Sequence, residues 1–406
     1  MKKALALLSL FSLLLMHVTA QYKNDNTSFK NIYLEDLCSD LKQHPKHLLL
    51  DVRSAGEYAD TSQYKSLNIG RLQDAVNISI QELNTRWKEL IPYKDETIYI
   101  YCSHSQRSRR ASKMLADSGF THIVNINGGM TNLNLRRNEV LPCAGSLYQT
   151  KNPYPFISPA ALIKLLQQEP GVFLLDIRSD SAYNGISTSE GLNALGRLKH
   201  SVHIPAEMID QSFDKIPNNK NIIVIDEDGS QGHDVAQQLK VKGYTNVQLL
   251  FNGMNAWVGI GDLPGKEALW EHPNLYRMIT AEEMNRMFFT DTTRLLLDVR
   301  TANEFNNRAK EYWKNKGSLK AAVNIPFTEM QTRIQELDRY KNQPVIVYDF
   351  SGQEESFKAS RMLADAGFTK VYLMMDGIFD LRWKAANIKE LSMLNDWVVN
   401  IPDDNK

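Results

Sequence analysis

The stretch LLLDVR at Leu48–Arg53 returns along the chain as FLLDIR at Phe173–Arg178 and again as LLLDVR at Leu295–Arg300. Each copy is a short apolar run that ends in an aspartate, which is typical of a strand buried on both faces of a parallel sheet. Successive copies are 125 and 122 residues apart. That spacing is the length of a whole domain, whereas solenoid repeats are roughly 20–50 residues long. The 406-residue chain is therefore predicted to contain three tandem domains.

A second apolar run follows each of these strands and ends in a residue that differs between copies. The run IYIYC ends at Cys102, IIVID ends at Asp226 and VIVYD ends at Asp349. Such runs alternate with amphipathic helical segments along the chain. This order is typical of an α/β domain in which a mainly parallel sheet is flanked by helices. The predicted fold class is therefore α/β in all three copies.

Helix-start signals and connectors rich in proline or glycine delimit the copies. Ser158 before Pro159 predicts an N-cap, and Thr280 with Glu283 three residues later predicts a capping box. Each copy is expected to open with a helix ahead of its first strand. The domains are predicted at residues 25–140, 156–262 and 275–390, with a C-terminal tail at residues 391–406.

The first twenty residues predict an export signal. Lys2 and Lys3 precede the apolar run Ala4–Met16, and Val18 and Ala20 place small residues before a cleavage point. Cleavage after Ala20 would give an exported protein, periplasmic or secreted. An uncleaved anchor is the alternative, but an apolar run of about 13 residues is shorter than the roughly 20 that span a bilayer. We therefore expect no stable membrane anchor.

Composition sets limits on the partners. The formal net charge at pH 7 is zero, and 43% of the residues are hydrophobic. Both values are ordinary for a globular protein, and neither indicates a basic surface for nucleic acid or for anionic lipid. No nucleic-acid partner is expected.

The chain has three cysteines, an odd number that leaves at least one thiol free in an oxidising compartment. Cys38 lies on an apolar helical stripe with Leu34, Leu37 and Leu41, which favours a core position. Cys143 lies in a proline-containing connector. A Cys38–Cys143 disulfide is the second interpretation, and its geometry is not encoded in the sequence.

Cys102 begins a polar loop that joins a buried strand to a helix. The loop reads Ser103-His104-Ser105-Gln106-Arg107-Ser108. The carboxyl ends of parallel strands are where such folds bind ligands, and loop N–H groups with a helix N-terminus form an anion-binding nest. We predict that Cys102 is a thiolate-rich nucleophile and that Arg107 presents planar donors to an oxyanion. A buried structural thiol is the alternative for Cys102. His104 could assist protonation, although an exposed loop histidine more often has no chemical role.

The succession DVR, GRLQDAVNI, IYIYCSHSQRS, SGFTHI and NGGM resembles the motifs of the rhodanese (sulfurtransferase) family. The resemblance covers nearly all of the first copy, and its framework covers the other two. It implies three rhodanese folds, of which the first uses Cys102 to take sulfane sulfur as a persulfide. The implied donor is a thiosulfate-like anion, and the implied acceptor is cyanide, a small thiol or a protein thiol. We expect no cofactor and no metal.

The length of the loop favours sulfur transfer over phosphate transfer. Arg107 follows Cys102 at the fifth position, which makes a six-residue cradle. The related phosphatases have a seven-residue loop with arginine where this chain has Ser108. The shorter cradle brings its N–H groups close to the sulfur and suits a bound persulfide. The expected substrate-binding residues are Ser103, His104, Ser105, Gln106, Arg107 and Ser108.

Asp51 and Arg53 recur in the copies that lack cysteine, so we expect them to support the loop through an ion pair rather than to catalyse. In the other two copies Asp226 and Asp349 replace the cysteine, and the loops contain no arginine. We hypothesise that these carboxylates turn into the nest and accept N–H bonds in place of the lost anion. A Ca²⁺ site around Asp226 is an alternative, although adjacent acids on a turn are usually solvated.

Two functions from different classes follow from these features. The intact loop of the first copy favours an exported sulfurtransferase with one working domain and two structural or docking domains. The altered loops favour a non-enzymatic scaffold in which Cys102 is incidental. A third interpretation is a thiol-redox or persulfide-carrier protein that serves a specific partner. The chain has no C-x-x-C motif, which argues against a dithiol mechanism.

Overall fold

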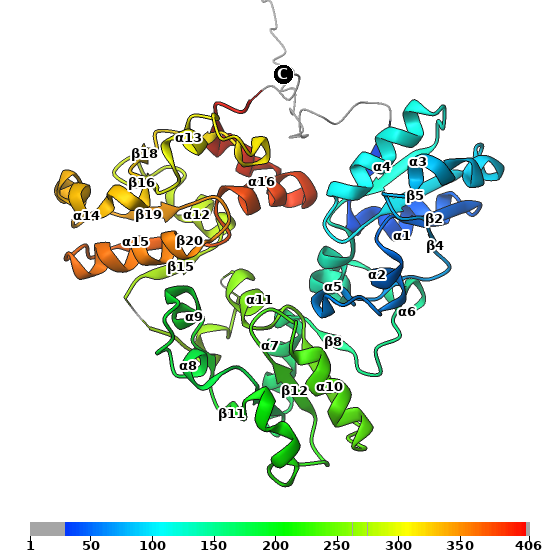
Figure 1. Ribbon diagram of the computed structural model, residues 1–406, viewed down its shortest axis with the longest axis horizontal. Helices are drawn as coiled ribbons and strands as arrows, with labels where there is room; N and C mark the ends of the chain where they lie inside the picture. The colour runs from blue at the N-terminus through cyan, green and yellow to red at the C-terminus, as the bar shows by residue number, and fades with distance from the viewer. Residues whose placement is uncertain (1–28, 262, 274, 403–406) are drawn as a thin grey trace, which may run out of the picture.

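The computed structural model describes residues 29–261, 263–273 and 275–402 and contains three α/β domains arranged as a ring (Figure 1). Each repeat builds one five-stranded sheet in which the neighbouring strands are parallel. The α/β class and the threefold repetition predicted from the sequence are confirmed. The predicted signal segment, residues 1–20, lies outside the described residues.

The sheet of the first domain has the strand order β1-β6-β5-β2-β4. Its strands are β1 (Lys30–Ile32), β6 (Ile123–Ile126), β5 (Thr97–Tyr101), β2 (His47–Asp51) and β4 (Val76–Asn77). Helices α1 (Leu34–Gln43) and α5 (Gly129–Val140) cover one face of the sheet. Helices α3 (Leu83–Arg86) and α4 (Gln106–Asp117) cover the other. Because β5 and β2 are central strands with apolar contacts on both faces, their sequences are continuous apolar runs.

The other two sheets repeat this order, as β8-β13-β12-β9-β11 and β15-β20-β19-β16-β18. The strands of the second domain are β8 (Phe156–Ile157), β13 (Val247–Leu250), β12 (Ile222–Ile225), β9 (Phe173–Asp176) and β11 (Val202–His203). Those of the third are β15 (Arg277–Ile279), β20 (Val371–Met374), β19 (Val345–Tyr348), β16 (Leu295–Asp298) and β18 (Val323–Asn324). The principal helices are α7 (Pro159–Gln168), α10 (Gly232–Val241), α11 (Gly253–Gly259), α12 (Ala281–Phe288), α15 (Glu354–Asp365) and α16 (Gly377–Asn387). Shorter helices are α2 (Ala55–Ala59), α6 (Ala144–Leu147), α8 (Asp180–Tyr183), α9 (Glu190–Ala194), α13 (Ala302–Phe305) and α14 (Met330–Arg333).

The expectation that each copy opens with a helix was wrong. The short strands β1, β8 and β15 come first, and each lies at the edge of its own sheet, paired with the inner strand next to it. Strands of two or three residues are too short to show an alternating pattern, and pairing with a neighbour holds them in place. The helix-start signals themselves are confirmed: Ser158 accepts from the N–H of Ala161, and Thr280 and Glu283 form a capping box.

The segment that follows each domain pairs with a short strand of that domain. Three antiparallel pairs repeat this arrangement: β3 (Arg71–Leu72) with β7 (Tyr148–Gln149), β10 (Arg197–Leu198) with β14 (Trp270–Glu271), and β17 (Ser318–Leu319) with β21 (Val398–Val399). A Cys38–Cys143 disulfide ties the first connector to α1. Of the two interpretations of Cys38, the structure therefore supports the disulfide, with a buried half-cystine on the apolar stripe.

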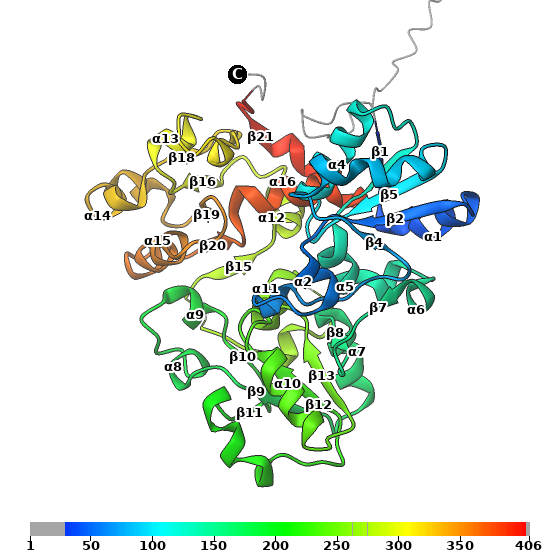
Figure 2. The same ribbon diagram turned by 45° about the vertical axis from the view of Figure 1, so that its right-hand side comes forward.

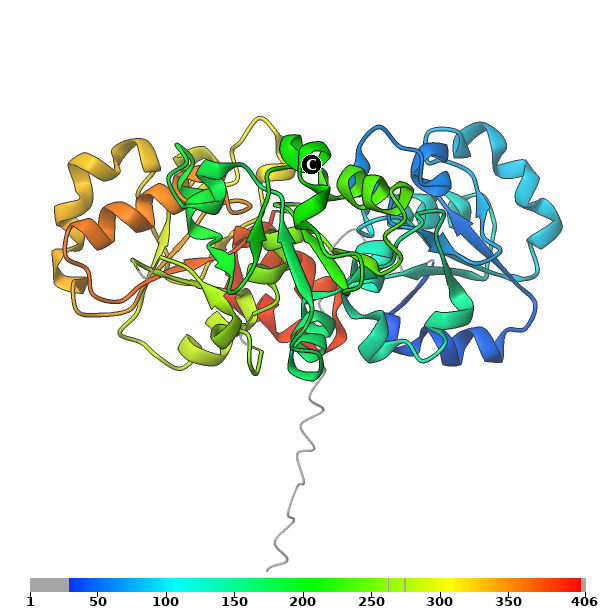
Figure 3. The ribbon, with the colours of Figure 1, turned by 90° about the horizontal axis from the view of Figure 1, so that it is seen from below.

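The three domains contact one another around the ring. One apolar cluster contains residues of the first and second domains, and another contains residues of the second and third. The Glu354 carboxylate of the third domain accepts from the Ser189 hydroxyl and the Glu190 N–H of the second, at 2.8 and 2.7 Å. Helix α16 extends from the third domain to the first (Figure 2). Seen from below, the second domain lies in front of this junction (Figure 3).

Within the described residues we found no helix with the length and apolar character needed to cross a membrane.

Candidate active site

A buried aspartate–arginine pair lies at the end of β2 in the first domain. The guanidinium of Arg53 donates to both carboxylate oxygens of Asp51, at 2.7–3.0 Å, and to the carbonyl oxygen of Gly70. Both side chains are fully buried. The same arrangement recurs at Asp176–Arg178 and Asp298–Arg300. A pair present in all three domains belongs to the framework of the fold.

Cys102 lies directly after β5, at the centre of the carboxyl edge of the sheet. The other two cysteines form the disulfide, and Cys102 is free and 1% exposed. The Ser105 N–H donates to its Sγ atom at 3.2 Å. Ser105 has a φ of 84°, in the left-handed region that non-glycine residues seldom adopt. This conformation turns the N–H group toward the sulfur, just ahead of the positive N-terminal end of α4.

Arg107 is paired with a carboxylate. Its two terminal nitrogens donate to the two oxygens of Glu57 at 2.6 and 2.7 Å, and one also donates to the Ser103 hydroxyl at 2.8 Å. Burial alone would raise the pKa of Glu57, but hydrogen bonds from Arg107 and Ser54 outweigh burial and hold it below its usual value. The guanidinium is therefore fixed in place and locally neutralised. Sequence analysis assigned Arg107 to the loop around Cys102 but did not identify Glu57 as its partner.

The remaining loop residues have distinct positions. His104 is exposed, and its ring nitrogens lie 2.9 Å from the Ser103 hydroxyl and 3.0 Å from that of Thr131. His104 also lines a cavity, and desolvation by the surrounding protein, together with the nearby Arg107 charge, lowers the pKa of His104. Gln106 is exposed, and Ser108 is buried with its hydroxyl donating to the Ser105 carbonyl at 3.0 Å. Of the predicted loop residues, the structure shows Ser105 in hydrogen-bond contact with the sulfur, whereas Arg107 and Ser108 bond to other groups of the site.

The corresponding loops of the other two domains hold carboxylates in the nest. Asp226 accepts from the N–H groups of Gly229 and Gly232 at 2.8 and 2.7 Å. Asp349 accepts from three successive N–H groups, those of residues 351–353, at 2.6–3.0 Å. Burial raises the pKa of each aspartate to about 6. The contacts hypothesised from the sequence are present. In each of these two cysteine-free loops, called the silent loops below, the aspartate side chain accepts the hydrogen bonds of the nest N–H groups.

The Ca²⁺ alternative has no geometric support. Among the described residues, no group of three or more His, Cys, Asp or Glu side chains is placed to hold a metal ion. The carboxylate of Asp226 is occupied by backbone N–H groups, and that of Asp228 accepts from Ser230.

Comparison with known proteins matches the rhodanese-like domain to residues 34–135, 158–259 and 280–385. The chain belongs to the rhodanese-like domain family. One relative is the thiosulfate sulfurtransferase PspE of Escherichia coli, 29% identical over 79 residues that make up 20% of this chain and 76% of the relative. The uncharacterised protein YqhL of Bacillus subtilis is 29% identical over 122 residues, 30% of this chain and 86% of that protein.

Similar chains are also found among solved structures. A rhodanese-related protein of Thermoplasma volcanium is 30% identical and covers 26% of this chain and 89% of its own, with a TM-score of 0.21. A thiosulfate sulfurtransferase of Pseudomonas aeruginosa is 17% identical and covers 85% and 66%, with a TM-score of 0.23.

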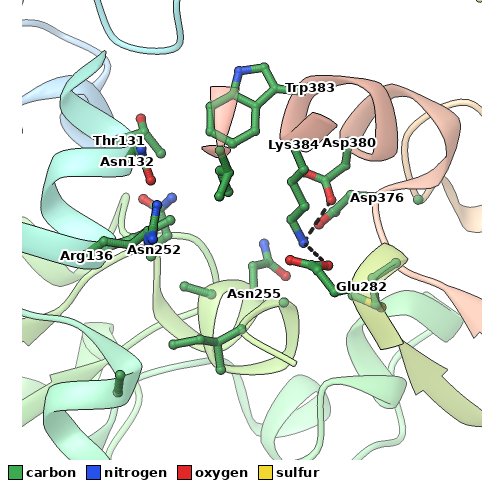
Figure 4. A pocket seen from close by; sticks show the side chains of 18 of the residues that line it. Thr131, Asn132, Arg136, Asn252, Asn255, Glu282, Asp376, Asp380, Trp383 and Lys384 are labelled. Atoms are coloured by element: carbon green, nitrogen blue, oxygen red, sulfur yellow. Dashed lines mark hydrogen bonds and ion pairs between the residues drawn. The ribbon is translucent and has the colours of Figure 1, made fainter. Parts of the chain in front are cut away.

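The loops of this three-domain rhodanese face a common space. A cavity of about 1590 Å³ lies between the domains, and residues from all three loops line it, including His104, Gln106, Glu227 and Gly352. Figure 4 shows polar groups that project into the cavity from three directions. Lys384 lies between Glu282 and Asp380, at 3.0 and 3.1 Å. A smaller pocket of about 270 Å³ adjoins it at His104.

Residues outside the first domain also reach the loop, and sequence analysis missed them. The Trp383 indole N–H donates to the His104 carbonyl at 2.8 Å, and Asn387 accepts from the Ser105 hydroxyl at 2.7 Å. Both belong to α16 of the third domain, roughly 280 positions from the loop. No spacing or motif in the sequence pairs them with it.

Proposed function

We propose that this rhodanese is an exported sulfurtransferase that moves sulfane sulfur from an anionic donor such as thiosulfate to a thiophilic acceptor. The observation that carries the proposal is Cys102 itself. It is the free cysteine, at the carboxyl end of a central strand, with a backbone N–H on its sulfur. Donated N–H groups stabilise a thiolate or a terminal persulfide sulfur, which is the species that such a reaction needs.

The reaction has two balanced half-reactions. The Cys102 thiolate attacks the outer sulfur of thiosulfate, a new S–S bond forms, and the old S–S bond breaks with its electron pair leaving on sulfite. Cyanide, a small thiol or a protein thiol then attacks the outer persulfide sulfur, and the electron pair of that S–S bond returns to Cys102. No external oxidant or reductant is consumed. This is covalent catalysis of the ping-pong type.

The loop residues have separate roles in this proposal. The Ser105 N–H stabilises the negative sulfur, and Arg107 orients the departing anion from a position fixed by Glu57. Ser103 and Gln106 contact the donor at the mouth of the cradle, while Ser108 holds the backbone of Ser105. The acceptor approaches from the central cavity through the side lined by His104.

Export of the protein is supported by its cysteine chemistry. A Cys38–Cys143 disulfide persists in oxidising compartments and seldom in the cytosol. The signal segment predicted at residues 1–20 would direct the chain to the periplasm or the exterior.

A non-enzymatic scaffold or persulfide carrier is the second candidate. Two of the three nests are filled by Asp226 and Asp349, and this observation favours a binding role for the second and third domains. A carrier would form the persulfide on Cys102 but would pass it only to one protein partner.

A thiosulfate:cyanide assay with intact-mass detection tests the proposal. We expect turnover by the full chain, a +32 Da adduct after thiosulfate alone, and loss of both in Cys102→Ser. Turnover that survives in Cys102→Ser would refute the site. An adduct without turnover would support the carrier, and neither adduct nor turnover would support the scaffold.

A further inference from the structure

The end of α16 in the third domain is fastened to the catalytic loop of the first. Asn387, the last residue of this helix, is fully buried. Its Oδ1 atom accepts from the Ser105 hydroxyl at 2.7 Å and lies 3.3 Å from the Gly128 nitrogen, whose N–H it also accepts. Its amide group donates to the Trp383 carbonyl at 2.7 Å, which fixes the side chain. The contact therefore joins a rigid helix to the residue that holds the sulfur.

Ser105 is held from two sides. Its N–H points at Cys102 Sγ, and its hydroxyl accepts from the Gly128 N–H at 2.5 Å while donating to Asn387. The left-handed backbone of Ser105 is one that a serine keeps only where its surroundings hold it. The surroundings that do so include a residue of another domain.

The two silent loops show what differs in the working one. The residue three positions after the strand-end residue is Gly229 in the second domain and Gly352 in the third, with φ values of 83° and 72°. Both donate their N–H to the aspartate that replaces the cysteine, as Ser105 does to Cys102. Glycine adopts this conformation without a side-chain penalty. Only the working loop of the three has a hydroxyl there, and that hydroxyl is bonded to the third domain.

We propose that Asn387 is a positioning residue for Cys102 and acts through Ser105, so that the cysteine-free third domain completes the sulfur cradle of the first. This inference rests on the proposed function. It gives the third domain a role that its own altered loop does not supply. The Trp383 bond to the His104 carbonyl fastens the same loop at the neighbouring residue.

The test compares Asn387→Leu, Ser105→Gly and the double variant in the full chain. Leucine keeps the branching and the number of heavy atoms of asparagine without its polar atoms, and glycine is the residue that the second and third domains have at the position of Ser105. The first readout is the pH dependence of Cys102 alkylation by iodoacetamide, which needs no turnover. The second is kcat/KM with thiosulfate and cyanide. The matched control is Lys389→Ala, which removes an ion pair to Asp36 between the same two domains at 3.2 Å but leaves the cradle untouched.

We expect Asn387→Leu to move the alkylation midpoint to higher pH and to lower kcat/KM by about three- to tenfold, the range for one lost hydrogen bond. Lys389→Ala should match the wild type. The double variant should be no worse than Ser105→Gly, because both changes break the same bond.

Unchanged alkylation and turnover in Asn387→Leu would overturn the inference, as would an equal loss in Lys389→Ala. If Asn387→Leu does not fold, Asn387→Ala decides, because it removes the acceptor of the Ser105 hydroxyl without placing a larger apolar side chain in the buried position: a shifted alkylation midpoint supports the inference and an unshifted one refutes it. Failure of the wild type to turn over would refute the proposed function alone, because the alkylation profiles would still report whether Asn387 positions the thiol.

Discussion

The Arg107–Glu57 pair is the feature of the site whose energetics can be worked from the structure. The guanidinium meets both carboxylate oxygens, and the Glu57 side chain is only 4% exposed against 26% for Arg107. Two single variants, Arg107→Ala and Glu57→Gln, and their combination separate the contribution of the pair from that of each residue. Arg86, paired with Glu89 on the surface, provides the matched control as Arg86→Ala.

Two opposite charges 2.7 Å apart attract by about 6 kcal/mol at an effective dielectric constant of about 20. Desolvation of the carboxylate cancels much of this attraction, and partial exposure of Arg107 screens more. We expect a net coupling of about 2 kcal/mol. Arg107→Ala alone should cost about 3 kcal/mol, because it leaves a buried carboxylate without its cation. The double variant should therefore be less destabilised than the sum of the two single variants.

Hydrogen-exchange mass spectrometry of β5 peptides measures the unfolding free energy of the first domain separately from the other two. Turnover assays in parallel report the electrostatic consequence. Glu57→Gln leaves the Arg107 charge without its counter-charge, so we expect KM for thiosulfate to fall by up to about fivefold, equivalent to about 1 kcal/mol. Arg86→Ala should leave both readouts unchanged. A coupling below about 0.5 kcal/mol, or a KM that rises in Glu57→Gln, would refute the reasoning.

Three further outcomes are expected. Asp51→Ala leaves the buried guanidinium of Arg53 unpaired and should destabilise the first domain by about 3–5 kcal/mol, measured by hydrogen exchange of β2. Replacing Cys38 and Cys143 by serine opens a loop with a sequence separation of 105 residues and should cost about 2–5 kcal/mol in a denaturant titration, with turnover retained. Burial raises the pKa of Asp226 to about 6, so its contribution to stability is complete below the unfolded-state pKa of 3.8 and is lost as pH rises through 6. When the pH is lowered from 7 to 5, this group should therefore raise the unfolding free energy of the second domain by about 1 kcal/mol. Asp226→Ser should abolish that increase, as measured by hydrogen exchange of β12.

The repeated strands were predictable because each is a local sequence pattern that occurs three times in the chain. The apolar runs of β2 and β5 and the residues that end them gave the sheet, its carboxyl edge and the position of Cys102. The carboxylates in the silent nests were predictable from chemistry, because buried N–H groups require an acceptor. Asp349 accordingly accepts from three of them.

Features that depend on distant contacts were not predictable. The edge strands β1, β8 and β15 exist because a neighbouring strand pairs with them, and two or three residues carry no pattern of their own. The Glu57 carboxylate binds Arg107, 50 positions away, and no local pattern pairs these two residues. Asn387 has no equivalent signal at all, since its bond to Ser105 spans 282 positions.

The residue that ends the strand and the residue three positions later vary together in this chain. Where the strand ends in aspartate, the carboxylate fills the nest and a glycine provides the left-handed turn, so the loop needs nothing from outside its own domain. Where the strand ends in cysteine, the sulfur accepts one N–H from a serine that is itself bonded to another domain. In the proposed reaction the nest alternates between a thiolate and a persulfide, and a fixed internal anion would then occupy the site of the transferred sulfur. Support from outside the loop would avoid this conflict, and the ring of three domains places Asn387 of α16 against Ser105, where we propose that it gives such support.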